Sequence, residues 1–246
     1  SIESAGTFTN NASGIVQAHH TFYNGIQVVH SGSVCTNHGS ILMGTIGSLG
    51  YNGILAEQSA SFTNSISGSI EINNVNPNWW SRGIMLTASG AFSNAGSIQL
   101  GNLLSNTTGI FVDGSGGFTN TSDGTITINN TTNNGVLVEV AGSSFLNNGD
   151  LLIGTAGSSM ENGILVQNNS TFSNGATGLI RINKANAQWW SKSVAVISAT
   201  FTNSGSIEAG NSSLNSYGLH VESTGSFTNQ VSGTIRVNTT TYNGIQ

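Results

Sequence analysis

Clustered carboxylates are the first groups to seek in this sequence, because β-helical enzymes that cleave polysaccharides use them as general acids, general bases or nucleophiles. The chain has ten carboxylates in 246 residues, and they form no repeated pair. They are Glu3, Glu57, Glu71, Asp113, Asp123, Glu139, Asp150, Glu161, Glu208 and Glu222. Glu71 and Arg181 fall at equivalent outward positions of an internal repeat, which indicates solvated decoration. We therefore predict that the chain is not an enzyme and has no catalytic residues.

Metal-binding and nucleophilic residues are also scattered. Four of the five histidines fall early, and they belong to different corners of the repeat, which predicts solvated side chains rather than a metal site. These four are His19, His20, His30 and His38. The single cysteine, Cys35, occupies a slot that other repeats fill with phenylalanine, which predicts a buried structural thiol. We expect no metal and no cofactor.

The four tryptophans form two doublets, in "NPNWWSRG" (76–83) and "NAQWWSKS" (186–193), 110 residues apart. A cation follows each doublet two residues later. We interpret these positions as a candidate interaction edge for lateral packing against an identical chain, since tryptophan is enriched at interface hot spots. The edge consists of Trp79, Trp80, Arg82, Trp189, Trp190 and Lys192. Two other interpretations stay open: a local cluster that covers a corner of the fold, and a platform on which a sugar stacks.

The composition excludes several classes of partner. Only 6% of the residues are charged, the net charge is −5, and five basic residues cannot form the basic stripe of a nucleic-acid groove. No apolar run approaches the ~18 residues of a membrane span, so we expect no membrane insertion of this segment. The abundance of Gly, Asn, Ser and Thr favours an extracellular location.

An internal repeat of about 27 residues runs through the whole chain, marked by "FTN" and its variants "CTN", "FSN" and "FLN". Its asparagines are Asn10, Asn37, Asn64, Asn94, Asn120, Asn147, Asn174, Asn203 and Asn229. Two residues before them stand Phe8, Cys35, Phe62, Phe92, Phe118, Phe145, Phe172, Phe201 and Phe227. We expect both sets to form structural ladders, with the phenylalanines stacked inside and the asparagines hydrogen-bonded from coil to coil.

Alternating apolar residues predict the elements of each repeat. Runs such as "GSIEI" (68–72) and "GTITI" (124–128) alternate with period two, and runs such as "GIFV" (109–112) follow after a turn. We predict an all-β fold, a right-handed parallel β-helix of about nine coils with three strands of three to five residues per coil. No helix longer than a turn is expected.

A longer period lies above the first one. The distance from each asparagine to the next glycine alternates between four and two residues, and "GTIGSLGYNGIL" (44–55) matches "GTAGSSMENGIL" (154–165). We interpret residues 1–246 as a single solenoid segment with a four-coil super-repeat of about 110 residues. Its units are about 1–110, 111–219 and the start of a third at 220–246. We expect it to be uncapped at both ends, as a piece of a longer array is.

The recurring stretches "GSFTN", "SGSIEINN" and "NGILV" resemble the large repetitive surface proteins of Bacteroidota-type bacteria. This resemblance covers the whole chain and implies a parallel β-helix, export by the type IX system, and a role as an adhesin or extracellular filament. The C-terminal sorting domain of such proteins does not occur in this sequence. We therefore predict a structural and adhesive repeat segment at the cell surface, which packs laterally into a homo-oligomer or filament and contacts surface glycans or other cells.

Three alternatives remain. A carbohydrate-active β-helix enzyme would gather its carboxylates on one face, and a phage-type fibre would trimerise. An ice-binding solenoid would show a flat Thr-x-Thr face in every coil. The stretches "TIT" (125–127) and "NTTT" (238–241) are local, so the sequence predicts that such a face is broken.

Overall fold

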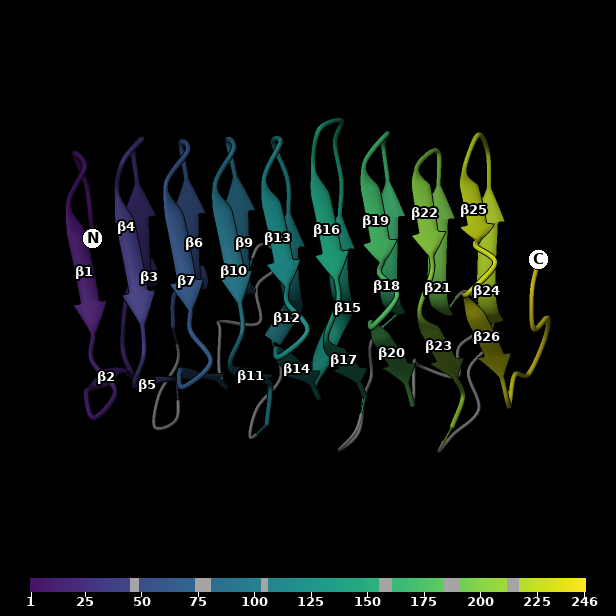
Figure 1. Cartoon of the computed structure of the whole chain (residues 1–246), viewed down its shortest axis with the longest axis horizontal. Helices are drawn as coiled ribbons and strands as arrows, with labels where there is room; N and C mark the ends of the chain where they lie inside the picture. The colour runs from purple at the N-terminus through teal and green to yellow at the C-terminus, as the bar shows by residue number, and fades with distance from the viewer. Residues whose placement is uncertain (45–48, 74–80, 103–105, 155–160, 184–190, 212–216) are drawn as a thin grey trace.

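The computed structural model describes residues 1–44, 49–73, 81–102, 106–154, 161–183, 191–211 and 217–246. These residues form strands and turns and no helix, and the strands wind into a rod with the two termini at opposite ends (Figure 1). Three sheets run along the rod, and all of their strand pairs are parallel. The prediction of an all-β solenoid with parallel sheets is confirmed.

Sheet one holds the "FTN" strands, four residues each. They are β1 (Thr7–Asn10), β4 (Val34–Asn37), β7 (Ser61–Asn64), β10 (Ala91–Asn94), β13 (Gly117–Asn120), β16 (Ser144–Asn147), β19 (Thr171–Asn174), β22 (Thr200–Asn203) and β25 (Ser226–Asn229).

Sheet two holds the next strand of each repeat, also of four residues. Its strands are β2 (Ile15–Ala18), β5 (Ser40–Met43), β8 (Ser69–Ile72), β11 (Ser97–Leu100), β14 (Thr125–Ile128), β17 (Asp150–Ile153), β20 (Leu179–Ile182), β23 (Ser206–Ala209) and β26 (Thr234–Val237).

Sheet three holds the last strand of each repeat, and these strands are longer than the three to five residues predicted. They are β3 (Asn24–Val29), β6 (Asn52–Glu57), β9 (Arg82–Thr87), β12 (Asn106–Val112), β15 (Thr131–Val138), β18 (Asn162–Gln167), β21 (Lys192–Ile197) and β24 (Tyr217–Glu222). Polar residues ahead of the glycine extend the pairing: Asn52 donates to Asn24 at 2.9 Å, and Asn162 donates to Asn134 at 3.0 Å.

The phenylalanines form an internal column beneath sheet one. From Phe62 to Phe201, neighbouring ring centroids lie 4.7–4.9 Å apart and the ring planes differ by only 4–6°. Cys35 pairs in register with Phe8 and Phe62 and is fully buried. Burial raises the pKa of its thiol to about 12, so the thiol is protonated at neutral pH and is a poor nucleophile.

The asparagines form a second column at the corner between sheets one and two. Each side-chain amide donates to the side-chain oxygen of the next asparagine along the rod, at 2.7–2.9 Å, from Asn10 through to Asn229. The same amides also donate to corner carbonyls, as Asn120 does to Gly124 at 3.2 Å. Glycine is needed at this corner, because a Cβ at Gly124 would collide with the Asn120 side chain and the Asn94 carbonyl.

Aliphatic columns from sheets two and three fill the rest of the interior. Ile70, Ile98 and Ile126 stand in register on sheet two, and Ile84, Ile110 and Val136 on sheet three. All six are essentially inaccessible to solvent. One continuous apolar core therefore extends along the rod, and each coil contributes the same few side chains to it.

Candidate functional site

Any function of this rod must use its outer faces, because the inward residues of every strand are committed to the core. Successive strand residues point to opposite sides, so the alternate residues of each sheet form outward columns parallel to the rod axis. The chemistry of these columns differs among the three sheets.

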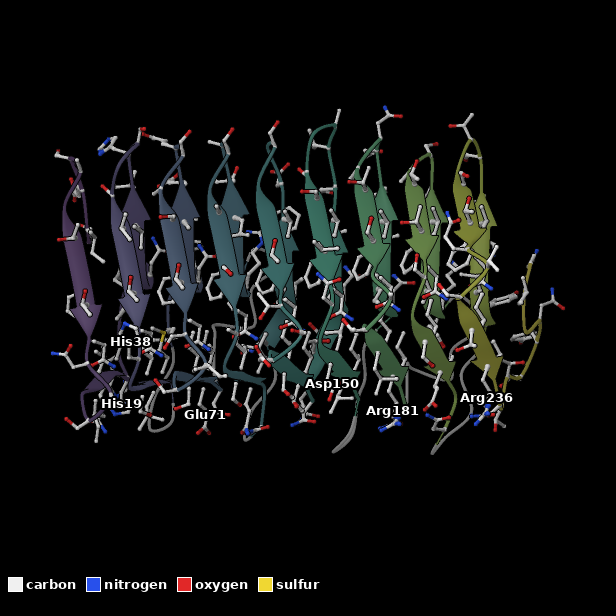
Figure 2. All side chains as sticks on the ribbon, in the orientation of Figure 1. His19, His38, Glu71, Asp150, Arg181 and Arg236 are labelled. Carbon is white, nitrogen blue, oxygen red and sulfur yellow. The ribbon has the colours of Figure 1, made fainter. Side chains whose placement is uncertain are left out.

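Sheet two presents a polar and partly charged column. Its middle outward residues are Gln17, Leu42, Glu71, Gln99, Thr127, Leu152, Arg181, Glu208 and Arg236. Figure 2 shows Glu71, Arg181 and Arg236 projecting from this edge of the rod. Arg181 Nε contacts Glu208 Oε2 at 2.9 Å, and this hydrogen bond lowers the pKa of Glu208. Both side chains are partly exposed, so the pair contributes little to stability.

Sheet three presents an apolar outward column that the sequence analysis did not identify. Its members are Gln27, Leu55, Met85, Phe111, Leu137, Leu165, Ala195 and His220. The sequence signal was present: runs such as "GIFV" and "GVLV" are apolar at consecutive positions, as in strands with two buried faces. Phe111 is only 3% exposed. The guanidinium of Arg82 lies over the Phe111 ring, 4.6 Å from its centroid.

Acidic residues flank this apolar column. Asp113 and Glu139 follow the paired Val112 and Val138 on neighbouring coils, close enough to Arg82 to raise the pKa of its guanidinium while burial lowers it. Asp113 accepts a hydrogen bond from the Gly114 amide at 2.6 Å, and Glu139 accepts one from Gln167 Nε2 at 2.6 Å. These two residues are the nearest approach to the carboxylate pair of a carbohydrate-cleaving β-helix, and both have structural partners.

The predicted interaction edge is only partly visible. Trp79, Trp80, Trp189 and Trp190 lie outside the described residues. Arg82 and Lys192 are the first residues of β9 and β21, and the strand register places them in one column at the start of sheet three.

Sheet one presents a hydroxyl-rich face that the sequence analysis missed. Threonine and serine flank the inward phenylalanine in most strands, as Thr7 and Thr9 flank Phe8 and Thr200 and Thr202 flank Phe201. The expectation of a broken Thr-x-Thr face rested on "TIT" and "NTTT", which belong to other parts of the coil. The recurrent "TFTN" was assigned to the internal ladder, and its two outward residues were overlooked.

The histidines lie apart from one another, as Figure 2 shows for His19 and His38. His30 is exposed in a turn with φ of 72°, and His220 contacts Glu222 at 2.8 Å on sheet three. Within the described ranges, no three His, Cys, Asp or Glu side chains come close enough together to hold a metal ion.

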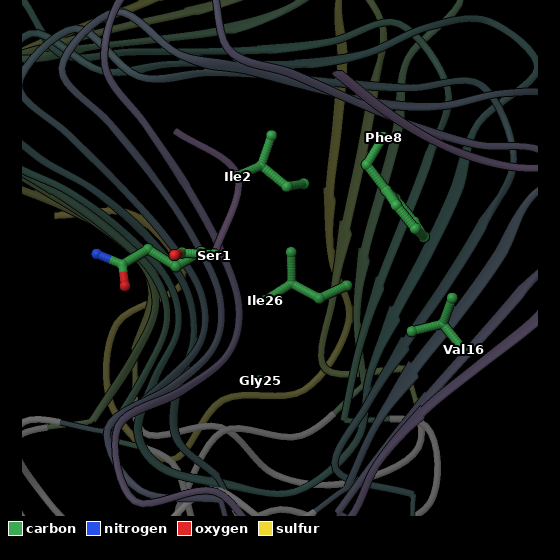
Figure 3. Close-up of a pocket in the computed structure, with 7 residues that line it drawn as sticks. Ser1, Ile2, Phe8, Val16, Gly25 and Ile26 are labelled. Atoms are coloured by element: carbon green, nitrogen blue, oxygen red, sulfur yellow. The ribbon is translucent and has the colours of Figure 1, made fainter. Parts of the chain in front are cut away.

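A cavity of about 230 Å³ opens at the first coil (Figure 3). It is lined by inward side chains of the three sheets, among them Phe8, Val16 and Ile26. Their register partners one coil further on, Cys35, Ile41 and Ile54, are fully buried. The cavity is thus the interior of the solenoid seen from its first coil, and its lining carries no titratable side chain.

The fold and these faces define a β-solenoid repeat protein. Comparisons with family models, with curated proteins and with solved structures found no match for this chain. The part of the chain that the structure describes contains no helix long and apolar enough to cross a membrane.

Proposed function

We propose that this chain is a structural and adhesive repeat segment of a large extracellular protein at the surface of a bacterium, and that it packs laterally against identical chains. The observation that carries the proposal is the unbroken asparagine ladder, which joins all nine strands of sheet one by hydrogen bonds between side chains. Such a ladder stiffens a rod along its whole length without building a local active site. Surface glycans and other cells are the proposed adhesion targets.

The proposal includes a right-handed solenoid of nine coils of about 27 residues, in two four-coil units and the start of a third. The strand counts of the three sheets and the spacing of the asparagines support this count. Right-handedness is supported by the strong preference for right-handed crossovers between parallel strands. An experimental density map that resolves side chains tests the hand directly.

We assign the lateral contact to the outer face of sheet three. Its apolar column is continuous over Leu55, Met85, Phe111, Leu137 and Leu165, and the charged residues beside it include Arg82 and Glu139. Every coil repeats the pattern, so two identical rods in matching register would align many weak contacts, and their summed effect is a durable association. The enzyme alternative is less well supported, because Asp113 and Glu139 are engaged by their own neighbours.

One coil offers a matched set of variants for testing this assignment. Leu146, Leu152 and Leu165 lie on β16, β17 and β18, and each points outward from a different sheet. We expect Leu165→Lys to reduce self-association, because it places a charge in the apolar column of sheet three. Leu146→Lys and Leu152→Lys add the same charge to the other two faces and should leave association unchanged.

Light scattering and sedimentation velocity over a range of concentrations measure the association, and a labelled chain measures binding to bacterial cells and immobilised polysaccharide. A chain that stays monomeric and binds cells no better than an inert protein would contradict the proposed function. Equal effects of the three lysine variants would show that sheet three is not the contact face.

A further inference from the structure

We propose that the outer face of sheet one binds ice. The face is a flat, uncharged array of threonine and serine side chains, repeated at the spacing of the coils. This inference goes beyond the structural and adhesive function and does not depend on it, because ice binding requires neither a cell nor a second chain.

Two outward columns make up this face, which we call the hydroxyl face. The first column consists of Thr7, Val34, Ser61, Ala91, Gly117, Ser144, Thr171, Thr200 and Ser226. The second consists of Thr9, Thr36, Thr63, Ser93, Thr119, Leu146, Ser173, Thr202 and Thr228. Fourteen of these eighteen residues carry a hydroxyl and none is charged.

The hydroxyl face is unusually flat. Adjacent strands of a sheet are normally rotated by about 20–25°, whereas the phenylalanine rings directly beneath this face stay within 4–6° of parallel from Phe62 to Phe201. Stacked rings on the inside and the asparagine ladder at the strand ends hold the coils in this untwisted arrangement. The outward side chains therefore stand in straight rows.

The spacing of these rows is regular in both directions. Along the rod, the ring centroids beneath the face repeat every 4.7–4.9 Å. Across the rod, the two columns are separated by two residues of an extended strand, or about 7 Å. A planar net with these two perpendicular repeats is close to the spacing of oxygen rows on the prism faces of hexagonal ice. A crystalline solid, unlike a single soluble ligand, is able to contact every coil at once.

The side-chain chemistry also suits ice. Each hydroxyl both donates and accepts hydrogen bonds, and each threonine methyl orders the water beside it. Among the described residues, Thr202 Oγ1 to Ser173 Oγ, at 3.0 Å, is the one hydrogen bond that joins two side chains of this face. The second-column side chains are half-exposed or exposed, so their hydroxyls face water.

The other two faces lack this combination. Sheet two carries Glu71, Arg181, Glu208 and Arg236 in its outward column, and these charges bind their own hydration water, which does not fit a crystal lattice. Sheet three is apolar in its middle column. The hydroxyl face alone is both uncharged and rich in hydroxyls, and the contrast provides matched controls within the same coils.

The test compares two double variants. Thr119→Arg with Thr228→Arg places two bulky charges on the hydroxyl face. Thr127→Arg with Thr234→Arg makes the same change at outward threonines of sheet two, in the same two coils. The two proteins have equal composition and net charge, so a difference in ice binding reports on the face and not on charge or solubility.

Each protein is mixed with an inert fluorescent protein, ice is grown slowly from the solution, and the fraction taken into the ice is measured. We expect the wild-type chain and the sheet-two variant to be enriched in the ice, at least about tenfold over the inert protein, since many weak contacts act together. We also expect them to shape single ice crystals into facets. The hydroxyl-face variant should be excluded from the ice like the inert protein, while its circular dichroism and melting match those of the sheet-two variant.

Exclusion of the wild-type chain from ice overturns the proposal, as does an equal loss in the two variants. Light scattering identifies the competing occupant, a second copy of this chain. If the hydroxyl-face variant loses self-association and the wild-type chain does not enter ice, the face is an interface between copies and the proposal is wrong. Cell binding and association through sheet three are measured without ice, so their failure is a separate result.

Discussion

Replacing one asparagine in the middle of the ladder tests how the rod is held together. Asn120 is fully buried, accepts a hydrogen bond from Asn94 at 2.8 Å and donates one to Asn147 at 2.9 Å. Alanine at this position removes both bonds. Asn94 keeps a bond to the Gly96 carbonyl, but the side-chain oxygen of Asn147 loses its donor from Asn120 in a place that water does not reach.

The magnitude follows from that oxygen and the space left behind. A buried polar group without a partner costs about 1–3 kcal/mol, and a small cavity adds to this, so we expect Asn120→Ala to lower the free energy of unfolding by about 2–4 kcal/mol. Asn229 provides the matched control. It accepts from Asn203 at 2.7 Å and donates to the Gly233 carbonyl at 2.8 Å, but it is exposed, so water replaces the lost bonds and the cost should stay below about 1 kcal/mol.

An aspartate at the same position adds a dependence on pH. The carboxylate of Asn120→Asp is able to accept from Asn94 but unable to donate to Asn147, and burial raises its pKa in the folded state above the unfolded value of about 3.9. A raised folded pKa means that stability is greatest below the unfolded pKa and is lost as the pH rises through the folded pKa. Asn120→Asp should therefore be closer to wild-type stability near pH 3.5 than at pH 7, and Asn229→Asp should show no such difference.

Thermal melting followed by circular dichroism at several pH values measures both effects. In a chain of this size, a loss of about 3 kcal/mol corresponds to a fall in melting temperature of roughly 6–12 °C. Equal melting of Asn120→Ala and Asn229→Ala would refute the ladder as a source of stability. A penalty for Asn120→Asp that is the same at both pH values would refute its burial.

Three further predictions concern the core and the repeat. Phe118→Ala should cost about 3–5 kcal/mol because its ring stacks between Phe92 and Phe145, whereas Phe227→Ala, at the last coil, should cost less; similar melting of the two variants would contradict the buried column. Cys35 should resist a thiol reagent at pH 8 until the chain is unfolded, and rapid labelling of the native chain would show that the site opens. Deletion of residues 113–221 joins Val112 to Glu222 at an equivalent position of the repeat, and should leave a shorter folded rod by circular dichroism and scattering; an unfolded product would mean that the coils are not additive units.

The repeat and its two ladders could be predicted from the sequence because each depends on a single residue type at one phase of the period. Phe62, Phe92 and Phe118 have the same neighbours in successive coils, so the spacing of "FTN" already places them in one column. The alternation in "GTITI" likewise identifies which residues of that strand point inward. The longer strands of sheet three could not be predicted, because pairing at Asn52 and Asn162 depends on stacking against the same residue type in the preceding coil.

The sequence by itself determined the period, the strands and the inward columns, since a two-residue alternation and a fixed repeat length specify which side chains stack. Only the tertiary structure decided what the outer faces are. Thr63 and Thr119 belong to one flat face because the coils between them do not twist, and Leu137 and Leu165 belong to one apolar face because their strands pair in register. Flatness and register are properties of the stacked coils rather than of any one repeat, so they emerge only when the coils are assembled.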